Sequence, residues 1–565
     1  MRRGIYIAAV AVSAALSLAP SAMGAPKPGW LTSSVLNPFA GSSPNHVSPH
    51  LLPNGTTMIV YSDLDSASGK TRVKVYQVLP NGRYVSPYFI SDTSGSASEP
   101  VMTVGATGSG AVVFAQLNGD SVGVIKMRRF NANGVFSPTT TSVSNPADGK
   151  ASQPSVGIGG DGMATMAWIT DSTPAVLRVK RIDTNGGEWG ADTLSSAAAS
   201  GQLCATSSSS CASPMVFSRS TGISTVVWLE TLVGHATPSI RTNQISTVDV
   251  LGTTPKTVLL PQQVARGPYY TYDAGLQGRM TTAGAVQLVW LAVVAGNHQV
   301  ESSRITTTGT PATVQTLSPT ATNSSPKSNP DLSVNASGAA VVAWADGTGA
   351  YYRRLSTGGS IPTHGKPAIK DPEQVVDGSA GNLTAGVLLT NSGVTYLVWL
   401  NQRTQLRTVV ATAKDYFPRH SRLPVVAGVN DGIPLLAQGP DGTISATWLH
   451  TGIAPGAFPQ LNTEVFRNSP KVASVKFPSL PRSRQRIALI KFTSTKGGSA
   501  LITIEGASRS VRFRKVSTRA AVLSGSSTVR FNTTGLVKGN YKVTIVLVDA
   551  AGLSATKTTR LIVTH

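Results

Sequence analysis

Apolar and polar positions alternate in short segments along the chain, and glycine-rich turns separate the segments. In the stretch from 154 to 196, "PSVGIGG" predicts one strand, "DG" a tight turn and "MATMAWIT" a second strand. "AVLRVKRIDTNGG" and "EWGADTLSS" predict a third and a fourth strand, and no helical period lies between them. The pattern therefore predicts an all-β fold.

This four-strand pattern recurs along the chain. Eight copies have a glycine six residues before an aromatic residue, and the aromatic residues stand 49 to 62 positions apart. The second strand is apolar on both faces, as blades stacked around an axis would require. The sequence predicts an eight-bladed β-propeller, with seven blades as the alternative. The aromatic residues are Tyr61, Phe114, Trp168, Trp228, Trp290, Trp344, Trp399 and Trp448.

Two repeated positions are predicted to be structural. The glycine, Gly162 in the third copy, should form the hairpin between the first two strands and adopt positive φ. An arginine opens an R-(F/I/L)-x-x-x-G pattern in the third strand of four copies, at Arg129, Arg181, Arg304 and Arg354. Because these arginines occupy one position of the repeat, we expect them to pack or pair between neighbouring blades.

The composition divides the chain into three parts. Arg2 and Arg3, the apolar run "IYIAAVAVSAALSLA" and the small residues of "AMG" predict a signal peptide over 1–24, with the mature chain starting near Ala25. The predicted propeller occupies 25–470. Its last copy is one strand short, and residues 28–49 match the text of a fourth strand, so the N-terminal strand should close the ring. Residues 471–565 contain six short strands and predict a β-sandwich.

The cysteines agree with export. Cys204 and Cys211 are separated by six residues, and in an exported protein this spacing favours a loop-closing disulfide, with free thiols as the alternative. No segment after the signal peptide is long and apolar enough to span a bilayer. We expect a secreted protein that is soluble outside the membrane, either free or associated with the cell envelope.

Two segments carry family resemblances. "DG" before the second strand, as at Asp161-Gly162 and in "DGTISATW", resembles the Asp-box turn of secreted sialidase-like propellers. The complete Ser-x-Asp-x-Gly-x-Thr-Trp order does not occur there, so no arginine triad or Tyr/Glu pair is assigned. "GLVKGNYKVTIVLVDAAGLSA" resembles the closing hairpin of bacterial immunoglobulin-like modules. These resemblances imply a propeller followed by an immunoglobulin-like sandwich.

Charge is concentrated at the C-terminal end. The chain has a formal net charge of +22, of which residues 471–565 contribute +15 from 17 basic and two acidic residues. So basic a domain attracts polyanions, and export favours an anionic cell-wall polymer, an acidic glycan or an anionic membrane surface over nucleic acid. A solvated surface that keeps the chain soluble is the alternative. The candidate polyanion-binding residues are Arg482, Arg484, Arg486, Arg509, Arg512, Arg514 and Lys515.

Candidate ligand-binding residues lie where second strands end and in one tyrosine-rich loop. Polar residues two positions after most repeat aromatics should meet at one propeller face, and loop tyrosines can stack on sugar rings. The alternatives are ordinary polar strand ends and a loop that plugs the ring. The candidates are Asp63, Glu230, Asp346, Asn401 and His450 at the strand ends, and Tyr269, Tyr270, Tyr272 and Asp273 in the loop.

Two functions remain open. The first is a binding or scaffold protein, a monomer with possible protein partners, whose propeller face binds a glycan or protein and whose basic domain attaches to the envelope. The second is a glycan-cleaving enzyme, a sialidase-like glycoside hydrolase or lyase. Its candidate carboxylates are Asp63, Glu230, Asp273, Glu301 and Asp346, of which two must share a site. No cofactor, metal or nucleotide motif is present. The binding function without catalysis is favoured.

Overall fold

The computed structural model describes most of the chain after residue 28, in separate segments. The described residues are 29–30, 34–35, 44–79, 83–119, 122–171, 175–189, 201–203, 213–232, 238–247, 255–259, 263–264, 275–294, 297–318, 330–346, 349–362, 373–375, 384–391, 393–401, 405–411, 421–422, 435–438, 444–451, 459–467, 472–477, 487–494, 498–507, 516–522, 525–532, 536–548 and 554–563.

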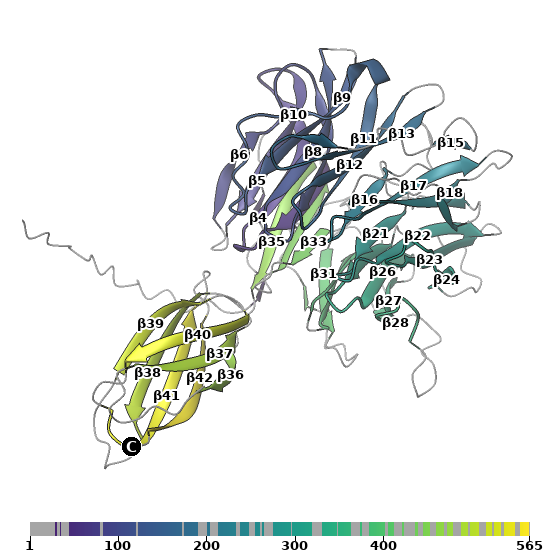
Figure 1. Ribbon diagram of the computed structural model, residues 1–565. Coiled ribbons are helices and arrows are strands. Elements are labelled where there is room, and N and C mark those ends of the chain that lie inside the picture. The colour runs from purple at the N-terminus through teal and green to yellow at the C-terminus, as the bar shows by residue number, and fades with distance from the viewer. Residues whose placement is uncertain are drawn as a thin grey trace, which may run out of the picture.

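The described part is all-β, as predicted. It contains small antiparallel sheets and one short 3₁₀ helix, η1 (Pro146–Asp148). This architecture is consistent with propeller-like folds. We number the sheets of the larger body from one to eight in chain order (Figure 1).

The first four sheets follow one another along the chain. Sheet one has β3 (Asn45–Leu51), β4 (Thr57–Asp65), β5 (Lys70–Val78) and β6 (Tyr84–Phe89). Sheet two has β7 (Ala97–Val104), β8 (Gly110–Asn118), β9 (Val122–Phe130) and β10 (Thr141–Ser142). Sheet three has β11 (Ala151–Ile158), β12 (Ala164–Thr170), β13 (Val176–Ile182) and β14 (Glu188–Trp189). Sheet four has β15 (Gly201–Leu203), β16 (Met215–Ser218), β17 (Ser224–Leu232), β18 (Ser239–Ile245) and β19 (Lys256–Leu259).

The next four sheets repeat the arrangement. Sheet five has β20 (Gln263–Val264), β21 (Gln277–Met280), β22 (Val286–Val294), β23 (Asn297–Ile305) and β24 (Gln315–Thr316). Sheet six has β25 (Asp331–Val334), β26 (Ala340–Asp346), β27 (Gly349–Leu355) and β28 (Glu373–Val375). Sheet seven has β29 (Thr384–Leu389), β30 (Thr395–Asn401), β31 (Gln405–Ala411) and β32 (Ser421–Arg422). Sheet eight has β33 (Leu435–Gln438), β34 (Ile444–Thr451) and β35 (Pro459–Arg467), with β1 (Gly29–Trp30) and β2 (Ser34–Val35).

Sheet eight joins the two ends of this region. Gly29 and Trp30 of β1 pair with Arg467 and Phe466 of β35, and β2 pairs with the same strand. The green strands of sheet eight lie beside the purple strands of sheet one in Figure 1, and β33 contacts β3. The outer edge of β35 is therefore paired with β1 and β2, so β35 is not an exposed edge strand.

The repeated glycine forms the turn that the sequence predicts. Gly162 has φ of 79°, and its N–H donates to the carbonyl oxygen of Gly159 at 3.0 Å. Six equivalent glycines also have positive φ, between 80° and 87°, and the eighth, Gly442, lies outside the described residues. Because only glycine adopts this conformation without strain, the turn explains why the residue recurs.

The aromatic residue of each repeat is buried between sheets. Trp228, Trp290, Trp344 and Trp399 are each no more than 1% exposed. The second strands of sheets two to seven contact both neighbouring sheets. In sheet five, Val289 of β22 packs with sheet six, whereas Trp290 packs with sheet four. The double-sided apolar pattern of these strands is thus explained by burial on both faces.

The C-terminal region is a two-sheet sandwich at the lower left of Figure 1. One sheet has β36 (Val472–Lys476), β37 (Ile487–Ser494) and β40 (Gly525–Asn532), and the other has β39 (Val516–Val522), β38 (Gly498–Gly506), β41 (Gly539–Val548) and β42 (Ser554–Val563). Alternate residues of both sheets form one core that includes Phe492, Ile502 and Ile545. The alternation of buried and exposed side chains indicates two solvated outer faces.

Candidate functional site

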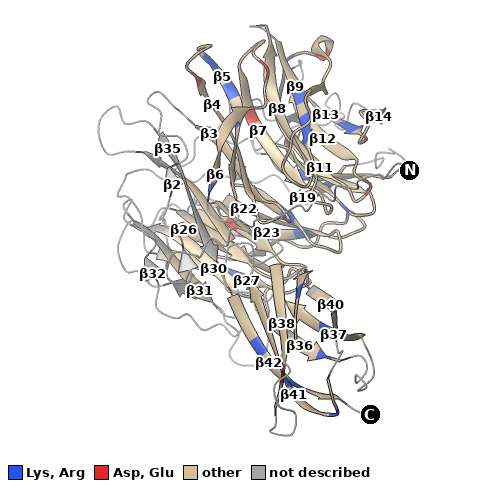
Figure 2. Ribbon diagram, turned by 90° about the vertical axis from the view of Figure 1, so that its left-hand side faces the viewer, with Lys and Arg blue, Asp and Glu red and all other residues tan. Residues whose placement is uncertain are grey.

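A basic residue stands opposite the repeat aromatic in four successive sheets. Register pairs join Tyr61 to Lys74, Phe114 to Lys126, Trp168 to Arg178 and Trp228 to Arg241. These basic residues lie on the third strands β5, β9, β13 and β18, and Figure 2 shows Lys and Arg positions along the first three. Because side chains of register partners point to the same face of a sheet, each cation lies beside its aromatic ring.

Each of these cations has an acidic partner. Lys74 Nζ lies 2.7 Å from Asp63 Oδ2, and Lys126 Nζ lies 2.5 Å from Asp92 Oδ2. The two remaining pairs are Arg178 with Asp148, at 3.3 Å, and Arg241 with Glu230, at 3.5 Å. We call these eight residues the ion-pair series. The series runs along the end of the second strands opposite the glycine turns, which is where we expected a ligand-binding face.

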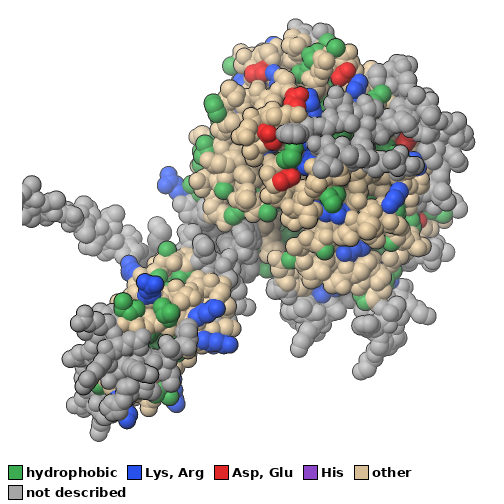
Figure 3. Space-filling model, viewed as in Figure 1, with side chains coloured by type: hydrophobic (Ala, Val, Ile, Leu, Met, Phe, Trp, Pro, Cys, Tyr) green, Lys and Arg blue, Asp and Glu red, His purple; other side chains and the backbone are tan. Residues whose placement is uncertain are grey.

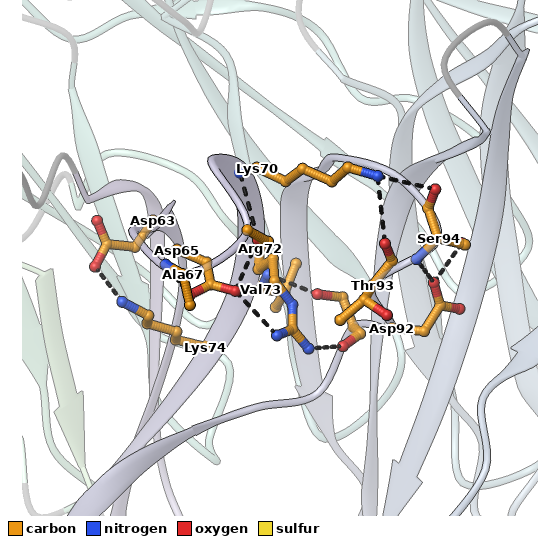
Figure 4. Close-up of polar contacts among 12 residues, drawn as sticks. Asp63, Asp65, Ala67, Lys70, Arg72, Val73, Lys74, Asp92, Thr93 and Ser94 are labelled. Atoms are coloured by element: carbon orange, nitrogen blue, oxygen red, sulfur yellow. Dashed lines mark hydrogen bonds and ion pairs between the residues drawn. The ribbon is translucent and has the colours of Figure 1, made fainter.

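Sheet one adds a second ion pair beside the first, shown in Figure 4. Arg72 Nη1 lies 3.2 Å from Asp65 Oδ2, and Arg72 Nη2 donates to the carbonyl oxygen of Ser91 at 2.6 Å. The guanidinium carbon is 3.9 Å from the ring centroid of Phe89, a cation–π arrangement. These contacts tie the end of β4 to the segment that leads from β6 to the next sheet.

The same segment holds Asp92, whose carboxylate accepts from several donors. Burial raises the pKa of Asp92, but hydrogen bonds from Lys126 and Ser94 outweigh burial and lower it to about 2. Gln116, the residue of β8 equivalent to Asp63, also donates to Asp92. Lys70 Nζ donates to the carbonyl oxygens of Thr93 and Ser94 at 3.4 and 3.3 Å. The ionised carboxylate of Asp92 therefore fixes the connection between sheets one and two.

Sheet five reverses the charge of this position. Trp290 pairs in register with Glu301, where the four preceding sheets have Lys or Arg. Trp290 Nε1 donates to Glu301 Oε2 at 2.9 Å, and Glu301 is 4% exposed. No Lys or Arg of the described segments forms an ion pair with Glu301. Burial raises the pKa of Glu301, and the bond from Trp290 offsets part of that increase.

A second cluster of ionisable side chains lies on the inner strands of three sheets. His50 of β3, Arg279 of β21 and Asp331 of β25 come from sheets one, five and six. Burial and the charge of Arg279 lower the pKa of His50 to about 4. Burial raises the pKa of Asp331, although Arg279 and the N–H groups of Val387 and Leu332 oppose that increase. Arg279 is thus close enough to influence two titratable groups on different sheets.

The structure assigns structural contacts to two of the candidates from the sequence. Asp63 and Glu230 are buried and neutralised by Lys74 and Arg241, and Glu230 also accepts from Trp228 Nε1 at 3.3 Å. Asp346, Asn401 and His450 lie in β26, β30 and β34 as expected, but their side chains are outside the described part.

The remaining candidates cannot be compared with the structure. The loop residues Tyr269, Tyr270, Tyr272 and Asp273 and the cysteines Cys204 and Cys211 lie outside the described residues. The same holds for Arg482, Arg484, Arg486, Arg509, Arg512, Arg514 and Lys515, and for the predicted signal peptide. The predicted disulfide, tyrosine loop and arginine patches stay predictions.

The sequence did not single out the cations of the ion-pair series. Lys74 and Arg241 follow their repeat aromatics by 13 residues, Lys126 by 12 and Arg178 by 10. The offset varies with the length of the turn between the second and third strands, so a search at fixed spacing misses the series. Each cation stands three residues before one position of the third strand, so aligning these strands on that position would have revealed the series. The position is held by Gln77, Arg129, Arg181 and Gln244.

Among the described residues, no group of three or more His, Cys, Asp and Glu side chains could hold a metal ion. No described helix has the length and apolar character needed to cross a membrane.

No protein-family model matches the sequence, and no curated protein does either. Solved structures match at low identity. A fungal alcohol oxidase of the AA5 family, in complex with copper, has a TM-score of 0.42 at 13% identity, covering 95% of this chain and 100% of its own. The BP39L lectin from Burkholderia pseudomallei has a TM-score of 0.42 at 10% identity, covering 68% of this chain and 100% of its own. The polysaccharide lyase Uly1 has a TM-score of 0.38 at 7% identity, covering 80% and 94%. At these scores the similarities assign no activity to this chain.

Proposed function

We propose that the protein is a secreted or envelope-associated binding protein. An eight-bladed propeller, closed by β1 and β2, presents a face to a glycan or protein ligand. An immunoglobulin-like sandwich with a basic surface attaches to an anionic envelope polymer. The eight sheets between residues 29 and 467 support the blade number. Tyr541 supports the immunoglobulin-like class, because its hydroxyl donates to the carbonyl oxygen of Val537 and accepts from its N–H, both at 2.9 Å, as in a tyrosine corner.

One observation favours a binding function over a catalytic one. The carboxylates of the ion-pair series are already paired with cations of the protein. A glycoside hydrolase needs two carboxyl groups about 5 to 10 Å apart, one of which acts as a proton donor. Asp63 and Glu230 each face a cation of their own sheet within 3.5 Å. Such pairs fix side chains of neighbouring strands within one sheet, and both carboxylates are engaged by cations of the protein itself. A rigid face of this kind suits the display of a ligand-binding surface.

Attachment is supported by the charge of the sandwich. Its described part holds eight basic residues and one acidic residue, Glu505. Figure 3 shows Lys and Arg side chains gathered on the visible side of this domain. Two like-charged register pairs, Lys542 with Arg560 and Lys476 with Lys491, are exposed on its outer faces. Because like charges opposite each other destabilise a sheet, a polyanion that neutralises them is a suitable partner.

A pull-down of the mature chain tests this function. The probes are purified bacterial cell wall, teichoic acid, polygalacturonate and phosphatidylglycerol vesicles, each across a salt series. We expect binding to at least one anionic material, with an affinity that falls steeply from low to physiological salt because counterion release drives it. Failure to bind any of them, or binding that salt does not weaken, contradicts attachment by charge.

Glu301 favours the alternative, a glycan-cleaving enzyme. It is a buried carboxyl group with a raised pKa, which is the property of a general acid. The test is the release of new reducing ends or unsaturated products from a panel of acidic and neutral polysaccharides. Release by the wild-type chain that is abolished in Glu301→Gln, while Asp148→Asn retains it, would establish this alternative. No release by the wild-type chain supports the binding function.

A further inference from the structure

The outer face of the four-stranded sandwich sheet has a regular chemical pattern. Register pairs align Ser517, Thr503, Thr544 and Thr558 in one row across β39, β38, β41 and β42. Neighbouring strands lie about 4.8 Å apart, so the row presents hydroxyl groups at that spacing over about 15 Å. All four side chains are exposed or half-buried. We call this set the hydroxyl row.

Cations flank the hydroxyl row on both sides. Two residues along the strands in one direction, Glu505, Lys542 and Arg560 form the next row, and in the other direction Arg519 stands opposite Leu501. Lys542, Arg560 and Arg519 are exposed, and Glu505 is the one acidic residue of the described sandwich. The basic positions on β41 and β42 are coloured in Figure 2. The face therefore combines a line of hydroxyl groups with a surplus of positive charge.

We propose that this face binds a chain of an acidic polysaccharide laid across the four strands. Its carboxylates pair with Lys542, Arg560 and Arg519, and its ring hydroxyls exchange hydrogen bonds with the hydroxyl row. The strand spacing is close to the length of one sugar unit in an extended chain, so successive units can meet successive strands. This inference rests on the proposed attachment of the sandwich to an anionic polymer and names the class of polymer and the face.

The surroundings favour a polysaccharide over a lipid surface or a nucleic acid. Membrane-binding faces insert large apolar side chains, and single-stranded nucleic acids stack on aromatic rings. In the described part of this face there is no aromatic residue. Its large apolar side chains are the half-buried Leu501 and Val546, the exposed Val548, and Ile562 at the edge beyond the Lys542 and Arg560 row. The opposite sheet carries the matched pair Lys476 and Lys491, but its hydroxyl side chains align across two strands only, Thr493 with Ser526, and it exposes Ile487. That sheet provides the control.

The experiment measures binding of the full mature chain to polygalacturonate. We expect Lys542→Gln with Arg560→Gln to weaken binding about tenfold, as loss of two charge-assisted contacts implies, and Lys476→Gln with Lys491→Gln to weaken it less than about threefold. Thr503→Val, Thr544→Val and Thr558→Val together keep the charge and the strand propensity, and should weaken binding about fivefold. Methyl-esterified polygalacturonate, which has the hydroxyls without the charge, should bind at least about tenfold more weakly.

The outcomes separate this inference from the proposed function. Equal effects of the two charge pairs, or no effect of the triple Thr→Val variant, overturn the face while attachment by charge stands. Stronger binding to teichoic acid or phosphatidylglycerol vesicles than to polygalacturonate overturns the polysaccharide but again leaves attachment intact. No binding to any polyanion overturns both. Unchanged circular dichroism and melting temperature exclude unfolding, and a second variant, Thr544→Val alone, keeps the test decisive if the triple variant does not fold.

Discussion

Arg129 of sheet two donates through Nη1 to the carbonyl oxygen of Gly162, the turn glycine of sheet three, at 3.1 Å. Arg304 makes the equivalent bond to Gly338 of sheet six at 3.2 Å, and Arg181 binds Gly222 of sheet four at 3.2 Å. The two recurring positions of the repeat thus contact each other across three interfaces between sheets. This explains why the arginine and the glycine recur together.

Removing the most buried of these arginines should destabilise the body of eight sheets. The side chain of Arg181 is 2% exposed and donates to the carbonyl oxygens of Gly222, Ser246 and Thr247. Arg181→Met keeps most of the volume but leaves these carbonyls without a donor, so we expect a loss of about 2 to 4 kcal/mol in the free energy of unfolding. Urea denaturation measures it. Lys150→Met on the exposed surface is the control, and an equal loss there would refute the contact.

The turn glycine should tolerate asparagine better than valine. Gly162 has φ of 79°, and a Cβ at this position would lie 3.0 Å from Thr184 Cγ2. Valine rarely adopts this conformation, whereas asparagine does so at lower cost. We expect Gly162→Val to cost about 1 to 3 kcal/mol and Gly162→Asn less. Ser142→Val, an exposed strand substitution, sets the baseline for the denaturation midpoints. An equal loss of stability in all three variants would show that the backbone angle φ at position 162 is not the cause.

Much of the repeat was predictable because its signals are local. The glycine turn depends on φ at one residue, and the arginines recur at one position, so the turns and the contacts of Arg129, Arg181 and Arg304 between sheets were predicted and are confirmed. The ion-pair series was not predicted, because it depends on register. Lys126 and Asp92 are 34 residues apart, and only the path of the chain from sheet one to sheet two brings them together.

The ion-pair partners of the strand-end residues were also beyond sequence reasoning. Asp63 and Glu230 looked like ligand contacts because polar residues end an apolar strand. The structure pairs them with Lys74 and Arg241, residues of the adjacent strand in the same sheet. A strand pattern shows which face a side chain occupies but not which charge on the next strand lies opposite.

Deleting the N-terminal strands should destabilise sheet eight. Removal of residues 25–36 takes away β1 and β2 and leaves the edge of β35 unpaired. We expect a lower melting temperature and concentration-dependent aggregation, because an open edge can pair with another chain. Light scattering and calorimetry measure both. Deletion of 25–28 alone, which keeps the strands, is the control. A melting temperature equal to that of the control would exclude closure by these strands.

His50 should make stability depend on pH in a defined window. Its pKa is lowered to about 4 in the fold, by burial and then by Arg279, whereas an unfolded histidine titrates near 6.5. Between these values the unfolded chain binds a proton that the folded chain does not. Stability is therefore complete above about pH 6.5 and falls as the pH decreases toward 4. His50→Gln should lose part of the difference between the denaturation midpoints at pH 7 and 5.5. Arg279→Met should reduce the same difference by raising the pKa of His50, and identical pH profiles in the three proteins would contradict the assignment.

Substitutions of Glu301 test whether its carboxyl group has a catalytic or a structural role. Its raised pKa means that the fold favours the protonated form, so stability decreases as the pH rises through the folded pKa. A neutral amide removes that cost and can still accept from Trp290 Nε1. We therefore expect Glu301→Gln to keep or raise the melting temperature at pH 7, and to lose any gain over wild type as the pH falls below about 4.3, where the carboxyl group is protonated in both states. Glu301→Ala should lower the melting temperature, because it opens a cavity and leaves the Trp290 N–H without its acceptor. If Glu301→Gln is instead as destabilising as Glu301→Ala at every pH, the ionised carboxylate itself holds sheets four and five together, and Glu301 belongs with the ion pairs rather than with a latent acid.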